Sequence, residues 1–244
     1  MLLNWSHTTI AGKPADVFEP ETKPRGAVLF LHPYGLESPA TNAVYTAELA
    51  KHGLACCAPF GAHSWWVDRV CPEFDPTLTA ERHLLDNVLP WMRAKWDVPE
   101  NAVAAAGISM GGQGALRLGF RHPDRFRVVA GVASAVDFWE RHGTGAELDA
   151  MYPTRERARQ DSATLQVNPA HFPPHVWFAC DPADEAWHRG NDRLAEKLTA
   201  FGLPFTADLD TSAGGHSWGY FDAVAPAMFA FVADGLAKER RRLV

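Results

Sequence analysis

Short apolar runs recur along the chain and predict a set of buried strands. Several of these runs are apolar at every position and lack the alternation of a half-exposed strand. Continuous apolar runs are typical of a parallel sheet that helices cover on both faces. The predicted strands span residues 15–19, 27–32, 54–59, 102–108, 127–134, 175–180 and 205–210.

Segments of helical length and amphipathic pattern separate these runs. They span residues 40–53, 77–96, 110–122, 187–202 and about 221–238. Pro90 should kink or divide the second of them. Because strands and helices alternate, the pattern predicts an α/β fold with a doubly wound, mostly parallel sheet and helices on both faces. We expect residues 1–244 to form one domain, since α/β chains of this length often stay undivided.

Residues 140–172 break the alternation. This stretch is polar, contains no predicted strand and lies between two strands. We expect either a small cap or lid of short helices over the sheet edge or a long connection. Connections of this length in a compact domain tend to be functional.

Composition and charge narrow the choice of partners. The chain is 47% hydrophobic and carries a formal charge of −6, so nothing favours binding to nucleic acid or to an anionic membrane. We see neither a signal peptide nor a run near the roughly 20 apolar residues of a membrane span. The four cysteines lack metal-type spacing and suggest free thiols in a reducing compartment. We therefore expect a cytoplasmic protein without a metal, and leave monomer or homo-oligomer open.

The most informative segment places a serine between a strand and a helix. Residues 107–111 read Gly-Ile-Ser-Met-Gly, directly after an apolar run and directly before a helical pattern. G-x-S-x-G at such a junction is the nucleophile elbow, in which a strained turn exposes the serine hydroxyl. The sequence therefore predicts Ser109 as a nucleophile. The backbone N–H of Met110, at the helix N-terminus, would face a developing oxyanion. A glycine-rich turn that serves only close packing is the alternative.

A serine nucleophile needs a base that an acid orients. On an elbow of this kind the chain order is nucleophile, acid, histidine. After the last predicted strand only His216 remains of the 11 histidines. The loop after residues 175–180 offers Asp181, Asp184 and Glu185. Asp181 suits the start of a turn, Glu185 could belong to the following helix, and spacing favours Asp184 without settling the choice.

The run GISMGGQGALRLGFRHPDRF, the acid loop and GGHSWGYFD together resemble one branch of the α/β-hydrolases. This is the Putative esterase branch, which includes S-formylglutathione hydrolases, feruloyl esterases and mycolyltransferases. The resemblance covers about residues 25–235 and implies a small or absent cap. In that family the acid stands in a G-x-x-D frame after the penultimate strand. Here Asp181-Pro-Ala-Asp184 fits the frame, with aspartate in place of the glycine, and this supports Asp184 as the acid.

The resemblance also implies a second oxyanion donor, from the loop at residues 32–37, HPYGLE. Pro33 has no N–H to donate. We therefore expect the backbone N–H of Leu36 to join that of Met110, with Tyr34 as the weaker alternative.

Candidate pocket residues follow from the same comparison. The segment SWWVDR at residues 64–69 falls where the family places residues that border the acyl pocket. Trp65 and Trp66 either line that pocket or lie in the core, where tryptophans are more often found. Tyr34 and Trp218 complete the candidate lining.

The resemblance implies a serine esterase that cleaves carboxylic esters or thioesters of small molecules through an acyl-enzyme. His216 would take the Ser109 proton, Asp184 would orient the imidazole, and no cofactor is required. The alternatives are acyl transfer to an alcohol, peptide cleavage, or an inactive hydrolase fold that only binds. S-formylglutathione would need cations near the pocket, and Arg69 is the obvious candidate.

Overall fold

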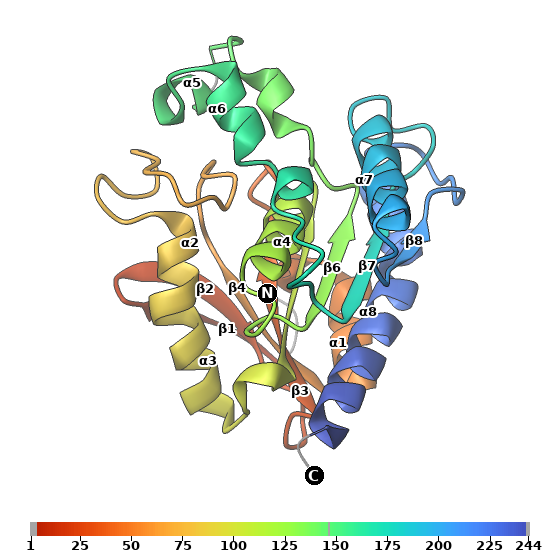
Figure 1. Cartoon of the computed structure of the whole chain (residues 1–244). Helices are drawn as coiled ribbons and strands as arrows, with labels where there is room; N and C mark the ends of the chain where they lie inside the picture. The colour runs from red at the N-terminus through yellow and green to blue at the C-terminus, as the bar shows by residue number, and fades with distance from the viewer. Residues whose placement is uncertain (1–3, 146, 243–244) are drawn as a thin grey trace.

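The computed structural model describes residues 4–145 and 147–242, which contain a single eight-stranded sheet (Figure 1). The strand order is β1-β2-β4-β3-β5-β6-β7-β8. Strands β1 and β2 pair antiparallel with their neighbours, and all pairs from β4 to β8 are parallel. The strands are β1 Trp5–Ile10, β2 Lys13–Phe18, β3 Gly26–Leu31, β4 Leu54–Pro59, β5 Val103–Ile108, β6 Val128–Val132, β7 His175–Ala179 and β8 Thr206–Asp208.

Helices cover both faces of this sheet. In Figure 1, α4 lies in front of the sheet and α1 behind it, where α1 packs against α8. The α-helices are α1 Ala43–His52, α2 Ala80–His83, α3 Leu89–Trp96, α4 Met110–Arg121, α5 Leu148–Met151, α6 Arg155–Gln160, α7 His188–Ala200 and α8 Trp218–Arg241. The 3-10 helices are η1 Pro39–Thr41, η3 Glu100–Ala102, η4 Phe138–Arg141 and η5 Ala163–Leu165. The predicted fold class is confirmed.

Strand β1 was not predicted from the sequence. It forms a hairpin with β2, with Ile10 opposite Lys13 and a turn at Ala11 and Gly12, both at positive φ. Only the two ends of β1 are buried, so it has no continuous apolar run. An edge strand with exposed positions lacks the signal that marked the central strands.

The second predicted helix changes its hydrogen-bond register directly before Pro90. A π turn, η2 Leu84–Val88, joins α2 to α3 without a break. At its end the N–H of Leu89 donates to the carbonyl of Leu84, five residues back. Pro90 then occupies the first turn of α3, where its missing N–H matters least. The change of helical register accommodates the proline.

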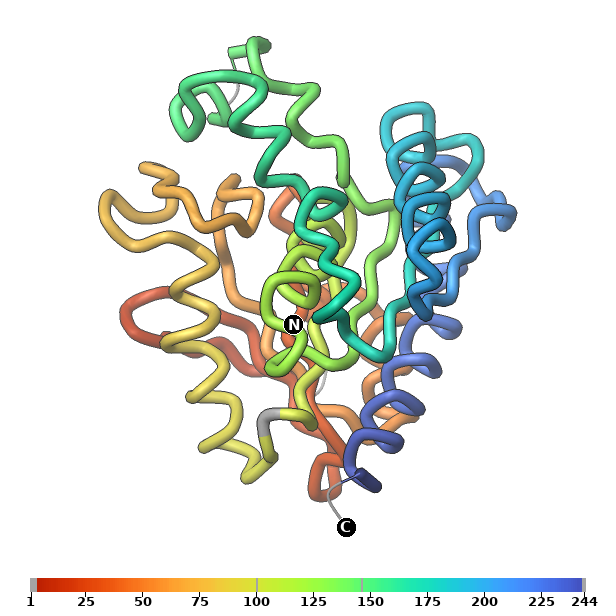
Figure 2. Tube along the Cα trace, in the orientation of Figure 1, coloured from red at the N-terminus to blue at the C-terminus, as the bar shows by residue number. Residues whose placement is uncertain are grey.

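The stretch at residues 140–172 is built mainly from the short elements η4, α5, α6 and η5. Figures 1 and 2 show α5 and α6 beyond the carboxyl ends of the central strands. The stretch is tied to the body of the fold, because buried Arg117 of α4 pairs with both Asp161 and Glu81. The N–H of Ala163 also donates to Gln113 Oε1 over 3.1 Å. Its described residues thus form a group of short helices joined to the body of the fold.

Helix α8 is the one described helix that is long and apolar enough to cross a membrane. Half of its apolar window is buried inside the fold. A core helix passes the same test, so this finding is weak evidence for a membrane span. All four cysteines are buried and free.

Candidate active site

Ser109 stands at the turn between β5 and α4 in a strained conformation, with φ 55° and ψ −114°. Hydrogen bonds hold the backbone there. Its N–H donates to Val132 over 2.8 Å, and its carbonyl accepts from Gln113 and Ala135, each over 3.0 Å. Positive φ is costly for a residue with a side chain and persists only where the surroundings enforce it. The strain at Ser109 is thus fixed by the neighbouring strand β6 and by α4.

The glycines around the serine are needed for close backbone contact. A Cβ on Gly107 would lie 2.3 Å from the carbonyl oxygen of Gly111. A Cβ on Gly111 would lie 1.9 Å from the carbonyl oxygen of Leu31, at the end of β3. No side chain fits at either distance, so the helix N-terminus can sit against the strand ends only with glycine at these positions.

His216 lies in the loop before α8, and its partner is Asp184. The Nδ1 of His216 is 2.7 Å from Asp184 Oδ2, and because a carboxylate only accepts, Nδ1 carries the proton. The other oxygen, Oδ1, accepts the N–H groups of Ala186 and Trp187, each over 3.1 Å. Asp184 is fully buried. Its two oxygens therefore have separate partners: one holds the histidine and the other the backbone of the acid loop.

Asp181 has a different set of partners. Its carboxylate accepts from the N–H groups of Ala183, Ala213 and Gly215 over 2.7, 2.7 and 2.8 Å, and from the Ser212 hydroxyl over 2.9 Å. Burial opposes its charge, but these donors outweigh burial and hold the pKa of Asp181 at about 2. Asp181 therefore joins the acid loop to the histidine loop, and its role exceeds that of the turn former expected from the sequence.

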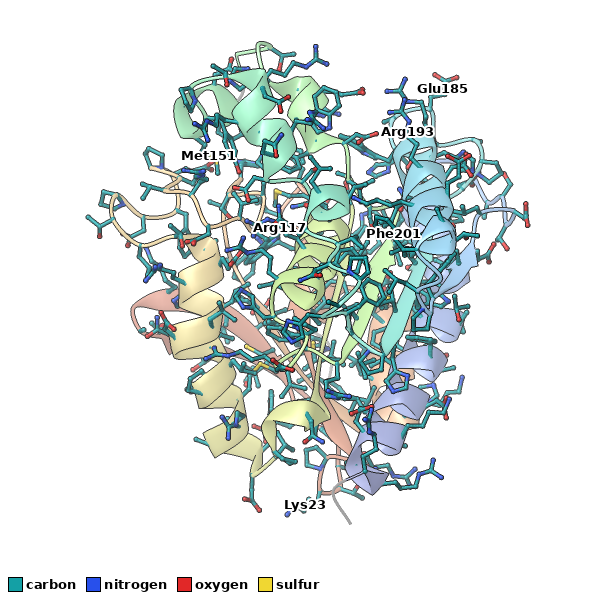
Figure 3. The ribbon with its side chains drawn as sticks, in the orientation of Figure 1. Lys23, Arg117, Met151, Glu185, Arg193 and Phe201 are labelled. Atoms are coloured by element: carbon teal, nitrogen blue, oxygen red, sulfur yellow. The ribbon has the colours of Figure 1, made fainter. Side chains whose placement is uncertain are left out.

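The side chain of the third acid, Glu185, forms no hydrogen bond or ion pair with the described residues. It is exposed, and Figure 3 shows its side chain pointing away from the fold. The expectation that Glu185 belongs to the following helix was wrong: it lies in the turn between Asp184 and α7, which begins only at His188. The turn is longer than the pattern suggested because Asp184 caps it with its own side chain.

Ser109 and His216 line one cavity of about 370 Å³. The side chain of His216 is 33% exposed there, and its Nε2 has no hydrogen-bond partner among the described residues. No hydrogen bond joins it to the Ser109 hydroxyl in this structure; such bonds often form only when substrate is bound. The cavity lining comprises Pro33, Tyr34, Gly35, Glu37, Trp65, Ser109, Arg141, Ala186, Trp187, His216, Ser217, Trp218 and Phe221.

The prediction that Leu36 supplies an oxyanion donor does not fit the structure. The N–H of Leu36 donates to the carbonyl of Pro33 over 3.0 Å and closes a turn in which Leu36 has φ 65°. Leu36 also lines a different cavity. Tyr34, the weaker alternative, lines the cavity of Ser109, and within the described chain its backbone N–H donates to no other group.

His32 fixes the loop that carries Tyr34. Its Nδ1–H donates to the carbonyl of Pro33 over 2.8 Å, and its Nε2 accepts the N–H of Gly61 over 2.9 Å. Because Nε2 accepts a hydrogen bond, the imidazole is neutral. Burial lowers the pKa of His32 to about 4, more than its hydrogen bond to Pro33 raises it. His32 thus shapes this loop.

The two tryptophans of the SWW segment separate into cavity and core. Trp65 lines the cavity and stacks on Phe138, with ring centroids 5.2 Å apart. Trp66 does not line it. Its indole N–H reaches the carbonyl of His32 over 3.3 Å, and its side chain fills the space that Gly61 and Gly114 leave open. Of the predicted pocket residues, Trp66 is therefore the one that does not line the cavity.

Arg69, the cation expected near the pocket, is also absent from the cavity lining. It lies 3.5 Å from Asp161 and faces the ring of Tyr152. The arginine in the described lining of the cavity is Arg141. Neither Arg141 nor Trp187 was predicted from the sequence as a lining residue. For Arg141, the signal available was its place in the cap predicted at residues 140–172. That signal could not single out Arg141 from the other arginines of the stretch.

The sheet order, the serine at a strained strand-to-helix turn and the histidine–carboxylate pair define an α/β-hydrolase. The family model of the Putative esterase family matches residues 42–232, most of the chain. The chain belongs to the Putative esterase family and is an enzyme of the carboxylesterase or thioesterase type.

Solved structures of similar fold agree with this family. An S-formylglutathione hydrolase from Agrobacterium tumefaciens has a TM-score of 0.77 and 15% identity, covering 95% of this chain and 94% of that one. Mycobacterium tuberculosis MPT51 has a TM-score of 0.76 and 17% identity, covering 96% of this chain and 100% of that one. A ferulic acid esterase has a TM-score of 0.73 and 17% identity, covering 91% of this chain and 93% of that one. A search of curated proteins by sequence returned no match.

Proposed function

We propose that this enzyme hydrolyses carboxylic esters or thioesters through an acyl-enzyme on Ser109, with His216 as the base and Asp184 as the orienting acid. The observation that carries the proposal is the 2.7 Å contact between His216 Nδ1 and Asp184 Oδ2. It favours the tautomer in which Nε2 is unprotonated, and the side chain of His216 lines the same cavity as Ser109.

In the first half-reaction, the Ser109 hydroxyl attacks the ester carbonyl while His216 Nε2 takes the proton. The oxyanion accepts hydrogen bonds from the backbone N–H groups of Met110 and Tyr34, and the N-terminus of α4 adds its dipole. The intermediate collapses, the C–O or C–S bond breaks, and the imidazolium gives its proton to the leaving alcohol or thiol. Asp184 stabilises that imidazolium throughout.

In the second half-reaction, water replaces the alcohol. His216 removes a proton from water as its oxygen attacks the acyl carbon. Collapse of this intermediate returns the proton to Ser109 and releases the acid. Each step uses only side chains and backbone groups that line the cavity or adjoin it.

The experiment is covalent labelling of Ser109 with a fluorophosphonate, combined with hydrolysis of p-nitrophenyl acetate. We expect wild-type protein to be labelled at Ser109 and to turn over the ester. Ser109→Ala should lose the label and at least ~10³-fold in kcat. The control is Ser217→Ala at another hydroxyl of the cavity, which should keep the label on Ser109. Unlabelled wild-type protein, or full activity in Ser109→Ala, would refute the proposal.

A further inference from the structure

The cavity of Ser109 has one permanent cation. Among its described lining residues, Arg141 and Glu37 carry fixed charges, and most of the others are aromatic or small. Arg141 is at the end of η4, in the cap. A guanidinium beside a reacting ester is well suited to recognise a carboxylate, because its donors match the two oxygens.

Arg141 is held in place by an aromatic face. Its guanidinium carbon lies 5.4 Å from the ring centroid of Trp187, which itself lines the cavity and is 5% exposed. The backbone N–H of Trp187 is bound by Asp184. The stacking thus fixes Arg141 relative to the acid loop and reduces the rotamer freedom that binding would otherwise remove.

The carboxylates near Arg141 in the sequence have other partners. Glu140 pairs with Arg189, and Asp137 lies 3.6 Å from Arg193. Glu147 accepts hydrogen bonds from the Tyr34 hydroxyl over 3.0 Å and from the Trp65 indole over 3.3 Å.

No carboxylate of the described chain lies within ion-pair distance of Arg141, so its charge is available to a ligand. Glu37, on the loop that follows β3, is the opposing charge in the lining.

We propose that the natural substrate is a small ester or thioester bearing a carboxylate, which Arg141 binds while the scissile carbonyl reaches Ser109. This inference rests on the proposed esterase function and adds the substrate class. The rings of Trp65, Trp187 and Trp218 would contact the apolar part of the substrate, between its carboxylate and its scissile carbonyl.

Two matched substrate pairs test the proposal and locate the carboxylate. On the acyl side, monoethyl glutarate is compared with ethyl pentanoate by pH-stat. On the alcohol side, 4-acetoxybenzoate is compared with methyl 4-acetoxybenzoate by absorbance. In one of the two pairs we expect the anion to be preferred about tenfold in kcat/KM, mainly through KM. Arg141→Gln should remove this preference, and 1 M NaCl should weaken it in the wild type because the arginine is exposed.

The matched control is Arg157→Gln, an exposed arginine of α6 that does not line the cavity. It changes the net charge equally and should leave the anion preference as in the wild type. Equal use of anion and neutral ester in both pairs, or an anion preference that survives Arg141→Gln, would overturn the inference while leaving the esterase proposal intact. Failure to hydrolyse any ester, with Ser109 unlabelled, would instead point to failure of the proposed function.

Discussion

Replacing Asp184 by asparagine should stop catalysis while preserving the fold. In the wild type, Oδ1 accepts two backbone N–H groups, from Ala186 and Trp187, and Oδ2 faces His216. In the variant, the side-chain amide oxygen must keep the two backbone donors, so the NH₂ group turns toward His216 Nδ1. Nδ1 then becomes an acceptor and the imidazole proton moves to Nε2. In that tautomer Nε2 cannot take the Ser109 proton.

The expected loss is about 10⁴-fold in kcat, the effect of a wrong histidine tautomer in a serine triad. At 1.36 kcal/mol per factor of ten this is about 5 kcal/mol of transition-state stabilisation. The melting temperature should change little, because every backbone donor to residue 184 keeps an acceptor.

Asp181→Asn should show the reverse pattern. Its carboxylate accepts four hydrogen bonds, two at each oxygen. An NH₂ group in place of Oδ1 leaves the N–H of Ala183 without an acceptor, whereas the Ser212 hydroxyl can turn and accept from the amide. At about 1–3 kcal/mol for a buried unsatisfied group, the loss of stability is about 1–3 kcal/mol. Catalysis should fall much less than in Asp184→Asn, at a temperature where the variant is folded.

The measurements are kcat and KM for p-nitrophenyl acetate with thermal unfolding of the same samples. Glu185→Gln is the control, since its side chain is exposed, and it should match the wild type in both. A 10⁴-fold loss of kcat in Asp181→Asn with normal melting, together with an active Asp184→Asn, would refute the assignment of the acid.

Two further predictions concern the supporting structure. Gly111→Ala should give little folded protein in expression and melting assays, because the new Cβ would lie 1.9 Å from the carbonyl oxygen of Leu31; normal melting would contradict the fixed strand–helix contact. Stability should also fall as the pH drops from 6.5 to 4. His32, with a pKa of about 4 when folded and 6.5 when unfolded, takes up its proton only in the unfolded chain over that range. The effect of His32 is about 3 kcal/mol, and urea titrations at several pH values should show a pH dependence smaller by about that amount in His32→Gln, where His83 and the carboxylates with lowered pKa values still contribute.

The parts of this enzyme that were predicted from sequence depend on local pattern and on chain order. Buried parallel strands are apolar throughout, so the central strands could be predicted from the sequence. Strand β1 could not, because only its two ends are buried. The elbow is a contiguous motif. The histidine and the acid loop follow from the order of elements, because parallel strands bring the loops at their carboxyl ends together. The choice of Asp184 among the three acids of that loop also rested on the family resemblance.

The parts that were missed depend on backbone conformation that side-chain pattern does not encode. Leu36, Trp65 and Trp66 all have positive φ, at 65°, 54° and 56°, without being glycine. At Leu36 the turn directs the N–H to Pro33, away from the cavity. The ring of Trp65 lines the cavity, whereas the ring of Trp66 packs against α4 in the space left by Gly114. Gly114 is far from both tryptophans in the sequence.

The contact between Arg141 and Trp187 could not be predicted from the sequence either. The two residues lie 46 positions apart, and neither position stands out by composition. Through Trp187 the proposed anion site and the acid loop form one structural unit. Asp184 binds the backbone of Trp187 with one oxygen and His216 with the other, and the ring of Trp187 supports Arg141. A single buried carboxylate therefore binds both the proposed base and the backbone of the residue whose ring supports Arg141.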